Sequence, residues 1–360
     1  MKKDEFHDLD DLIDDVKKLL DDQPAETTGE PAPDPKEDYS EWLYRQGGEA
    51  PAAEKPPKKK HRFWKVLLWL LGILIAGCLA MWFLFAKQPA ATEDTLGARR
   101  AGSSTILLAG TDAGGTRTDT MVLLNVDQSA RTVSLISIPR DTYVSGYSVP
   151  KLNSALGAGG GGKEGMAELM DRVTELIGYR PDGYVLVELD GFRRIVDAIG
   201  GVEFDVPMEM HYSDPAQDLT IDLAAGPQRL DGEKAMELVR FRSGYAQADL
   251  ARVEVQRDFL KAAIQQTVSL KNLPKAPALL PIVLANTTTD LDPANLTWMA
   301  KTLLVCDKDS ITMQTMPGRP QMIGGGSYYL IDASAAAELL NEHCNPYEAA
   351  ITPEMLHVRS

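Results

Sequence analysis

The chain has 360 residues, enough for one large domain or two ordinary ones with a sizeable core. Hydrophobic residues make up 44% and charged residues 25%, and these values exclude a chain that is disordered throughout. The formal net charge of −15 argues against a protein that coats nucleic acid, so no nucleic acid partner is expected. With 3 cysteines and 5 histidines, the sequence also excludes a disulfide-dense scaffold, and it contains no zinc-type spacing.

The first 65 residues differ sharply in charge from the rest of the chain. Residues 1–55 carry 7 basic and 17 acidic side chains together with many prolines, so we expect a mostly disordered acidic tail. Within it, apolar residues at helical spacing over 8–20 predict a short amphipathic helix, either a partner-docking segment or a nascent helix. Residues 56–65 then form a basic cluster without any acid.

Residues 66–86 contain no charged side chain, and this length suffices to cross about 30 Å of hydrocarbon. Trp64, Trp69 and Trp82 lie near its ends, as interfacial anchors do. We therefore expect one transmembrane helix in the cell membrane. Because Lys and Arg beside a span stay inside, the N-terminus is expected in the cytoplasm and residues 87–360 outside. A cleaved signal peptide or a buried helix fits less well, because the segment begins so far along the chain and is so long.

Beyond a linker over residues 87–103, strand and helix patterns alternate. Strands are expected at 105–109, 121–126, 132–138, 184–189 and 202–206, and a tight connection at 127–130 joins the second to the third. Helices are expected at 164–177, 192–199, 233–239 and 249–270. This order predicts an α/β domain over residues 104–345, with a mixed central sheet and helices on both faces, followed by a C-terminal tail over 346–360.

A glycine-rich run at residues 157–163 approaches a phosphate-binding loop but lacks its final Ser or Thr, since position 164 is Glu. No strand precedes the run, so a nucleotide site is not expected. Neither a G-x-S-x-G nor an H-E-x-x-H motif occurs, which disfavours a serine hydrolase or a zinc peptidase.

A first cluster of charged residues lies at the ends of the first three expected strands. Asp112 follows the first strand, Arg117 and Asp119 precede the second, and Arg140 and Asp141 follow the third. If these strands pair as antiparallel neighbours, all five residues meet at one sheet edge. Paired carboxylates suit Mg²⁺ that is shared with a substrate phosphate, and neighbouring arginines suit a phosphate clamp. The alternative is a structural network of salt bridges.

A second cluster follows the helix expected at 233–239. Arg240 and Arg242 face the same side if the chain leaves the helix by about residue 239 and becomes extended. Asp249, Arg252 and Gln256 share one face of the next helix. A solvated charged face is the ordinary explanation of such a stripe, but arginine-rich loops in an acidic domain indicate a polyanionic ligand.

These residues resemble the LytR-CpsA-Psr (LCP) family. The resemblance covers residues 103–270, with a C-terminal continuation to about 345, and rests on eight segments in order: Ala109-Gly-Thr-Asp112, Arg117-Thr-Asp-Thr120, Ser137-Ile-Pro-Arg-Asp-Thr142, Lys151-Leu-Asn-Ser-Ala155, Val196-Asp-Ala-Ile-Gly-Gly-Val202, Leu230-Asp-Gly232, Arg240-Phe-Arg242 and Asp249-Leu-Ala-Arg252.

The resemblance implies a transferase that moves a glycopolymer, such as a teichoic acid or a capsule, from an undecaprenyl-pyrophosphate carrier to peptidoglycan as a phosphodiester. It implies Mg²⁺ (or Mn²⁺) as cofactor, held by Asp112 and Asp119. The catalytic residues that it implies are Arg117, Asp119, Arg140, Arg240, Arg242 and Asp249. The residues implied to bind the pyrophosphate are Arg117, Arg140, Lys151, Asn153, Arg240, Arg242, Arg252 and Gln256. The general base stays open between Asp119, Asp249 and activation by the metal alone.

Two departures from the family pattern concern the long helix and the first loop. Val255 stands where relatives often carry a second arginine, Arg257 points about 100° away from Gln256, and the 112–119 loop is short. For the polyprenyl tail we expect an apolar cavity lined by aliphatics such as Val185, Val187, Leu169, Val173 and Leu260, although these residues would also suit an ordinary core.

Two other functions remain open beside the transferase. One is a pyrophosphatase or binding protein for the carrier lipid, and the other is a regulatory envelope protein of the kind labelled a transcriptional attenuator. No helix-turn-helix or basic DNA-binding arm occurs in residues 1–65, which disfavours the second of these.

The cysteines leave one structural question open. Cys78 lies inside the expected span, and Cys306 and Cys344 lie in the part expected outside. A disulfide between Cys306 and Cys344 or two buried thiols are the alternatives.

Overall fold

A computed structural model describes residues 65, 68–73, 77, 84–90, 96–112, 114–215, 219–241, 248–267, 276–306 and 310–359. The chain divides into two units, Met1–Trp69 and Leu70–Ser360, and every element named below belongs to the second. Within the described residues, no helix combines the length and the apolar character needed to cross a bilayer. Most of the span expected at 66–86, and all of the acidic tail, lie outside the described residues.

The centre of the second unit is a mixed six-stranded sheet in the order β10-β3-β2-β1-β4-β9. Its strands are β1 Ser103–Thr111, β2 Thr118–Asp127, β3 Thr132–Ser137, β4 Gly183–Val187, β9 Thr287–Thr289 and β10 Ile311–Thr315. β2 is antiparallel to β1 and β3, whereas β4 is parallel to β1 and β10 is parallel to β3. The expected antiparallel pairing of the first three strands is therefore present, and the turn between β2 and β3 is fastened by Ala130 N, which donates to Asp127 Oδ1.

Smaller two-stranded ribbons surround this sheet. They are β5 Val202–Val206 with β8 Gly226–Leu230, β6 Met210–Asp214 with β7 Leu219–Leu223, and β11 Gly318–Ile323 with β12 Gly326–Ile331. The helices are α4 Ala155–Ala158, α5 Gly162–Ile177, α6 Leu189–Ile199, α7 Gly232–Arg240, α8 Ala248–Thr267, α9 Ala276–Ala285, α10 Pro293–Val305 and α11 Ala333–His343, with short 3-10 turns at Leu152–Ser154 and Pro353–Met355. Leu189, expected at the end of a strand, instead begins α6, because Glu188 is its N-cap.

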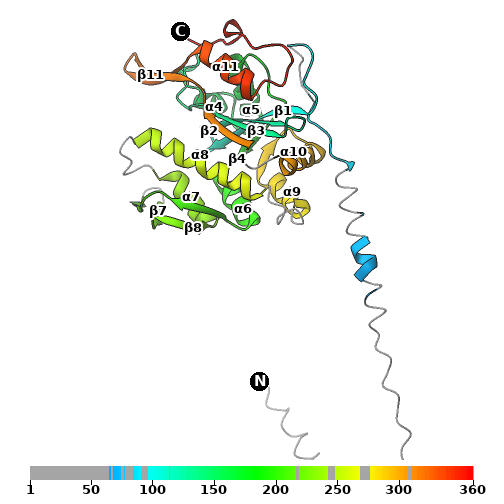
Figure 1. Ribbon diagram of the computed structural model, residues 1–360. Coiled ribbons are helices and arrows are strands. Elements are labelled where there is room, and N and C mark those ends of the chain that lie inside the picture. Colours follow the sequence, from blue (N-terminus) through cyan, green and yellow to red (C-terminus); the bar gives the residue numbers. More distant parts are fainter. Residues whose placement is uncertain are drawn as a thin grey trace, which may run out of the picture. The chain divides into compact units, whose positions relative to one another are not determined.

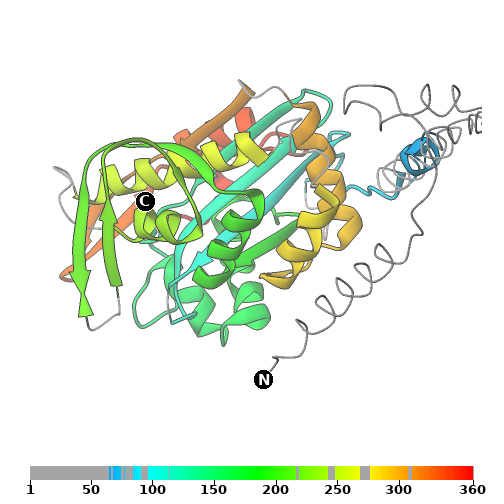
Figure 2. The same cartoon turned by 90° about the horizontal axis from the view of Figure 1, so that it is seen from below.

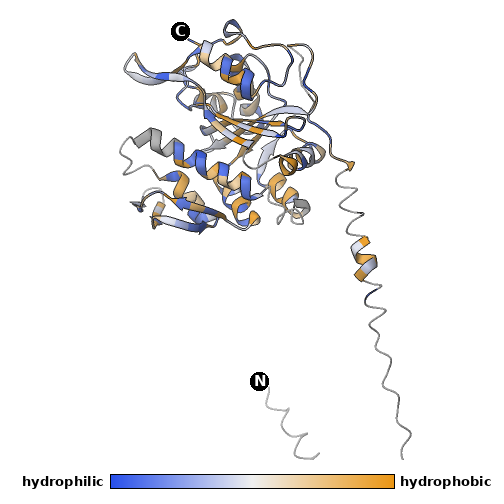
Figure 3. Cartoon of the chain, in the orientation of Figure 1, coloured by the Kyte–Doolittle hydropathy of each residue, from blue (hydrophilic) through white to orange (hydrophobic). Residues whose placement is uncertain are grey.

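Helices cover both faces of the sheet, as the sequence predicts (Figure 1). On one face, β-strand residues such as Leu107 and Leu123 pack with α5 and α11. On the other, Ile106 and Leu124 pack with α10 and with Leu260 of α8. Strand residues alternate between these two cores because successive side chains point to opposite faces. Hydrophobic residues accordingly run through the central strands and α9 (Figure 3).

α8 lies between the sheet and a third layer that contains α6, α7 and the ribbons β5–β8 and β6–β7 (Figures 1 and 2). Phe259 of α8 is buried in a further core, together with Val202, Leu238 and Phe241, whereas Leu260 faces the sheet. α8 therefore separates this further core from the core between the sheet and α10.

The division of apolar residues between the faces corrects the expected lipid cavity. Leu169 and Val173 are fully buried in the α5 core, whereas Val185, Val187 and Leu260 belong to the α8 side of the sheet. One cavity cannot be lined by all five residues, because the sheet stands between the two groups.

The same division decides between the two alternatives for the cysteines, in favour of free thiols over a disulfide. Cys344 is buried in the α5 core, Cys306 packs against the α10 core, and both are free thiols. The sheet separates them, and Cys306 Sγ instead lies 3.7 Å from the carbonyl oxygen of Thr132, to which it donates. Sequence spacing could not reveal this separation.

The last residues also differ from expectation, because residues 346–359 are not a tail. Tyr347, Ile351 and Leu356 are all buried in the α5 core. Tyr347 forms an antiparallel bridge with Arg99 from the expected linker, supported by Arg100 N to Pro346 O at 2.9 Å. These apolar residues continue the packed core beyond residue 345.

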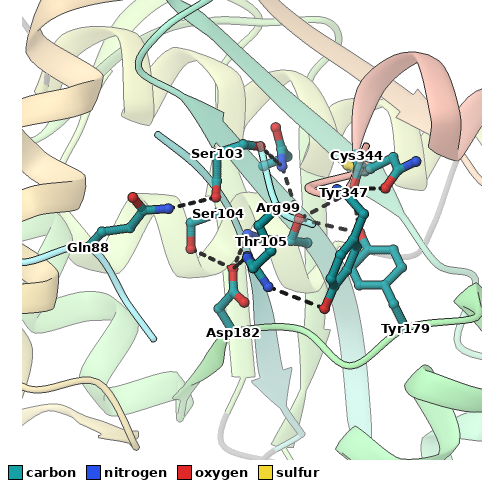
Figure 4. A network of polar contacts seen from close by, with 11 residues as sticks. Gln88, Arg99, Ser103, Ser104, Thr105, Tyr179, Asp182, Cys344 and Tyr347 are labelled. Carbon is teal, nitrogen blue, oxygen red and sulfur yellow. Dashed lines mark hydrogen bonds and ion pairs between the residues drawn. The ribbon is translucent and has the colours of Figure 1, made fainter. Parts of the chain in front are cut away.

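A polar network lies at the amino end of β1 (Figure 4). The carboxylate of Asp182, whose side chain is 1% exposed, accepts hydrogen bonds from Arg99 Nη2 at 2.7 Å, Ser104 Oγ at 2.7 Å and Thr105 N at 3.0 Å. Arg99 lies over the Tyr347 ring, 4.9 Å from its centroid. The hydroxyls of Thr105 and Tyr179 both donate to the carbonyl of Cys344. This network joins the start of the domain to its end.

Candidate functional site

The first predicted cluster gathers at the carboxyl end of β1, where β2 begins and β3 ends. Arg140 Nη1 lies 2.8 Å from Asp119 Oδ1, and about a quarter to a third of each side chain is exposed. The register of β1 and β2 shifts between Gly110 and Thr111, so Asp119 occupies the irregular position of a bulge. Bulges re-aim side chains next to functional sites. Here the bulge places Asp119 beside the guanidinium of Arg140.

Asp112 organises the loop that connects β1 to β2. Its Oδ1 accepts hydrogen bonds from the backbone N–H groups of Thr116 at 3.2 Å and Arg117 at 3.3 Å, while its own N–H donates to Arg117 O at 2.9 Å. These contacts close a short loop and leave the side chain of Arg117 exposed. The second carboxylate oxygen of Asp112 has no hydrogen bond in the described part of the chain, which leaves an acceptor facing the site.

The glycine-rich run of residues 157–163 supports this loop from behind. A Cβ atom at Gly157 would lie 2.6 Å from the carbonyl oxygen of Thr116, a distance that real Cβ atoms do not show. Glycine therefore lets α4 approach the Asp112 loop closely. This contact explains the glycine at position 157 without a bound nucleotide.

Lys151 and Asp141 form a second ion pair next to the first. Lys151 Nζ lies 2.7 Å from Asp141 Oδ1, and Arg140 Nε lies 3.9 Å from Asp141 Oδ2. The backbone N–H of Asn153 donates to the carbonyl of Arg140 at 3.1 Å, so the Lys-x-Asn segment is fastened to the end of β3. Asp141 thus connects Arg140 with Lys151, and sequence reasoning noted this acid without assigning it a role.

The β11–β12 ribbon holds this segment from the outside. Tyr143 N donates to Tyr329 O and Tyr329 N donates to Asp141 O, both at 2.9 Å. Lys151 Nζ lies 5.5 Å from the centroid of the Tyr328 ring. The sequence analysis missed this support, because Tyr328 and Tyr329 lie far along the chain in a ribbon that carried no strand pattern.

The second predicted cluster is described only in part. Arg240 is the last residue of α7 and Phe241 is extended, as expected for a chain that leaves the helix there. Arg242, and the side chains of Asp249 and Arg252, lie outside the described residues. Gln256 Nε2 donates to the carbonyl of Val239 at 2.7 Å, which fastens α8 to the end of α7. Val255 is buried in the core between these helices, so an arginine would not fit at that position without rearrangement.

An open pocket of about 800 Å³ is lined by one residue from each cluster, whereas Arg117, Asp119 and Arg140 are not among its lining residues. Asp112 from the β1–β2 loop and Arg240 from α7 both line it, together with residues of α6 and β7. It lies at the carboxyl ends of the parallel neighbours β1 and β4, which is where ligands bind in α/β sheets. The geometry therefore brings an aspartate of the first cluster and an arginine of the second into one cavity.

Metal-binding capacity at this end of the sheet depends on carboxylates alone. Across the described residues, no group of three or more His, Cys, Asp or Glu side chains is arranged to hold a metal ion. Asp112 and Asp119 flank one loop and could supply two oxygen ligands. Mg²⁺ often takes one or two protein carboxylates and completes its shell with substrate phosphate and water. The donor set thus fits a hard divalent ion that arrives with a phosphorylated substrate.

A family model and a known relative both match most of the chain. Residues 86–345 match the model of the LytR_cpsA_psr family. The chain is 29% identical over 329 residues to the polyisoprenyl-teichoic acid–peptidoglycan teichoic acid transferase TagU of Oceanobacillus iheyensis, a match that covers 84% of this chain and 98% of that protein.

Solved structures share the fold. The crystal structure of TagV from B. subtilis superposes with a TM-score of 0.57 at 24% identity, over 68% of this chain and 98% of that one. A structure of TagT bound to LIIa-WTA gives a TM-score of 0.54 at 24% identity, over 67% of this chain and 89% of that one.

Proposed function

Because the chain belongs to the LytR_cpsA_psr family, we propose that it transfers a glycopolymer, such as a teichoic acid, from a polyprenyl-pyrophosphate carrier to peptidoglycan as a phosphodiester. One observation carries the proposal: Asp112, Asp119 and Arg140 gather at one end of the sheet, and Arg240 shares a pocket with Asp112. Carboxylates for a metal and guanidiniums for phosphate are what phosphoryl transfer requires.

In this proposal Asp112 and Asp119 hold Mg²⁺ (or Mn²⁺), which supplies charge neutralisation to the pyrophosphate when it is bound. Asp112 closes the loop between β1 and β2 by its own hydrogen bonds, and Asp119 lies just beyond that loop in β2. Arg140 is already fixed by Asp119, so its guanidinium is oriented before a substrate arrives. A preorganised donor costs no reorganisation at the moment of reaction, which is the main advantage of such a site.

The remaining arginines hold the pyrophosphate in this proposal. Arg117 is exposed at the end of the loop, directly before β2, and Arg240 lines the pocket. In this proposal both guanidiniums reach the pyrophosphate. Lys151 and Asn153 bind the pyrophosphate next to Arg140. The other residues proposed to bind it are Arg242, Arg252 and Gln256. Asp249 supports these arginines or, like Asp119, acts as the base on the acceptor hydroxyl.

The polyprenyl tail is proposed to lie on the α8 face of the sheet. The α5 face is packed with fully buried residues, whereas Leu108, Val187, Leu260 and Ile264 on the α8 face are only partly buried. Partly exposed aliphatics can gain burial when an apolar chain covers them, at about 25 cal/mol per Å². The five residues expected to line one cavity therefore reduce to those on this face.

The proposed setting is the outer side of a cell membrane. Residues 66–86 serve as a single membrane anchor, the N-terminus is cytoplasmic, and the domain that begins near residue 96 faces peptidoglycan. The support is the uncharged segment itself and the basic cluster before it. Protease added to intact protoplasts should digest the domain, and digestion of residues 1–60 alone would invert this topology.

Product analysis tests the proposed reaction. The purified full chain in detergent, with Mg²⁺, receives a lipid-pyrophosphate-linked glycan and peptidoglycan oligomers, and mass spectrometry identifies the products. The proposal expects polymer attached to a muropeptide through phosphate. Free phosphate products without a polymer-bearing muropeptide would instead identify a pyrophosphatase. Binding of the donor without turnover would favour a regulatory or carrier-binding protein.

A further inference from the structure

One part of the pocket next to Asp112 and Arg240 is strongly acidic. Five carboxylates line it: Glu188, Asp190, Asp222, Glu233 and Glu237, which we call the acidic arm. Arg193 is shared by Glu233 at 3.2 Å and Asp190 at 4.0 Å, and His211 Nδ1 lies 2.8 Å from Asp222 Oδ1. Glu188 is exposed and has no partner within the described residues. The arm therefore keeps an excess of negative charge after its internal pairs are formed.

The fold builds this arm from several elements that converge. Glu188 and Asp190 come from the start of α6, directly after β4. Glu233, Glu237 and Arg240 lie on one face of α7, because residues three and four apart are neighbours on a helix. Asp222 comes from β7, and its N–H donates to Glu237 Oε2 at 2.7 Å. The arm is thus a formed wall of the pocket and not a loop of loose charges.

A buried hydroxyl in the same pocket lacks a partner. Thr111, the last residue of β1, lines the pocket and is 4% exposed. Its Oγ1 makes no hydrogen bond to any described residue. An unsatisfied buried hydroxyl costs about 1–3 kcal/mol, so such groups are usually satisfied by a ligand or a water. Thr111 therefore offers a hydroxyl that a water or a polar ligand of the pocket would satisfy.

The charge of the arm selects between the two substrates of the proposed reaction. The amino end of α6 favours negative charge, and the N-cap Glu188 and first-turn Asp190 already supply it, so a further anion there meets two carboxylates. A polyanionic donor polymer is repelled by such a wall, whereas carboxylates accept hydrogen bonds from sugar hydroxyls and pair with ammonium groups. Because Asp112 and Arg240 border the arm, its occupant lies beside the reacting phosphate.

We propose that the acidic arm binds the acceptor: a saccharide that presents hydroxyl groups and carries a free ammonium group on its peptide. The inference rests on the proposed function and adds to it the separation of the two substrates by charge. The donor lies on the arginine side of the pocket, and the acceptor hydroxyl enters from the acidic side. Thr111 Oγ1 contributes a neutral hydrogen bond at the junction of the two sides.

Binding measurements on the full chain in detergent test the proposal. The acceptor probe is a muropeptide with a free side-chain amine, its partner probe is the same muropeptide acetylated on that amine, and the donor probe is geranylgeranyl pyrophosphate. The Glu188→Gln/Asp190→Asn variant should bind the free-amine muropeptide about tenfold more weakly and lose the preference over the acetylated form, as expected for lost charge-assisted contacts. Binding of the prenyl pyrophosphate should be unchanged or tighter.

Thr111→Val provides an independent test. It keeps the side-chain shape and removes only the hydroxyl, so the thermal midpoint should stay or rise while muropeptide binding weakens about threefold to tenfold. A lower midpoint with unchanged binding would show that the hydroxyl is structural and would overturn its part of the proposal. Glu338→Gln is the matched control, because Glu338 is an exposed acid on α11, which packs on the other face of the sheet.

Other outcomes overturn the assignment of the arm. Equal muropeptide affinity in wild type and variants excludes an acceptor site, and a loss of prenyl pyrophosphate binding assigns the arm to the donor. Mg²⁺ titrated alone that binds wild type but not Glu188→Gln/Asp190→Asn identifies a metal site instead. If wild type and variants transfer polymer with the same KM for the acceptor, the acceptor site is refuted and the proposed reaction stands. If muropeptide binding depends on the arm but no polymer is transferred, the proposed reaction is refuted and the binding site stands.

Discussion

Each end of β1 carries an arginine–aspartate ion pair, but the two pairs differ in their exposure to solvent. At the amino end, Arg99 and Asp182 form an ion pair at 2.7 Å in which the carboxylate is buried and its Oδ2 also accepts from Ser104 and Thr105. At the carboxyl end, Arg140 and Asp119 form a pair at 2.8 Å in which both side chains stay partly exposed. The comparison shows that arginine and aspartate alone do not identify a site. What distinguishes the site is polar capacity that the protein leaves open to solvent.

Replacing Arg140 should give the largest effect and should spare stability. Arg140→Ala removes a preorganised guanidinium, so transfer should fall by about 10²–10³-fold, as for the loss of one transition-state donor. Because the pair with Asp119 is partly exposed, the free energy of unfolding should change by no more than about 1 kcal/mol. Polymer transfer to muropeptides and urea unfolding measure the two quantities.

Arg131→Ala is the control for this substitution. Arg131 is exposed in the turn between β2 and β3, at the opposite end of these strands, and it adopts φ 56°. Its loss should leave transfer unchanged. A similar loss of transfer in both variants, or full activity of Arg140→Ala, would contradict the distinction between the two ends of the sheet.

Replacing Arg99 should have the reverse effect. Arg99→Ala leaves the buried carboxylate of Asp182 without its cation, which should lower the free energy of unfolding by about 2–3 kcal/mol. Transfer per folded molecule should remain at the wild-type rate, because the network lies at the far end of β1. Urea unfolding followed by tryptophan fluorescence, with activity normalised to folded protein, separates these results. An unchanged free energy of unfolding would show that the network at Arg99 does not stabilise the fold.

Gly157→Ala should sharpen the comparison, because it disturbs the open end through packing alone. The added Cβ must displace the carbonyl of Thr116, which belongs to the loop closed by Asp112. A shift of the loop by a few tenths of an ångström should lower transfer about tenfold and change the thermal midpoint little. Ala158→Ser, an exposed neighbour on α4, should be neutral. Wild-type transfer by Gly157→Ala would mean that the loop tolerates movement.

The smallest effect is expected at the thiols. Burial, together with the charge of Asp127, raises the pKa of Cys306 to about 11, and burial raises the pKa of Cys344 further. Since the thiolate is the reactive form, a pKa two units higher lowers its fraction at pH 8 about a hundredfold. Both cysteines should therefore resist alkylation in the native protein and react fully after unfolding. Mass spectrometry of a non-reduced digest that found them bridged would contradict the separation by the sheet.

Strong local patterns made part of this fold predictable. The apolar runs of β1, β2 and β3 are long, and the turn at Asp127 has its own side-chain cap, so the antiparallel pairing followed from sequence. The ribbons β6–β7 and β11–β12 were missed, because their strands are short and mostly exposed. The network at Arg99 was also missed, since its partner Asp182 lies 83 positions away and no local pattern links them.

For the candidate site, the pairing of charged residues at strand ends was more predictable than the set of residues that surrounds them. Asp119 and Arg140 could be paired from strand order alone, because both lie at ends that an antiparallel sheet brings together. The acidic arm could not be predicted, because Glu188 and Glu233 come from different helices and meet only when α6 and α7 pack. The two cysteines illustrate the same limit, since their positions reveal nothing about which side of the sheet each occupies.

The polar network at the amino end of β1 also bears on the order in which the chain can finish folding. Thr105, near the start of the domain, and Tyr179 both depend on the carbonyl of Cys344, and Arg99 pairs with Tyr347. Until residues 344–347 arrive, these groups lack those contacts, although Asn125 already donates to Thr105 and Asp182 already accepts from Arg99. The α5 core is completed only when Cys344 and Tyr347, which are buried in it, have joined the chain. A truncation before residue 344 should leave a trapped, protease-sensitive intermediate rather than a smaller stable domain.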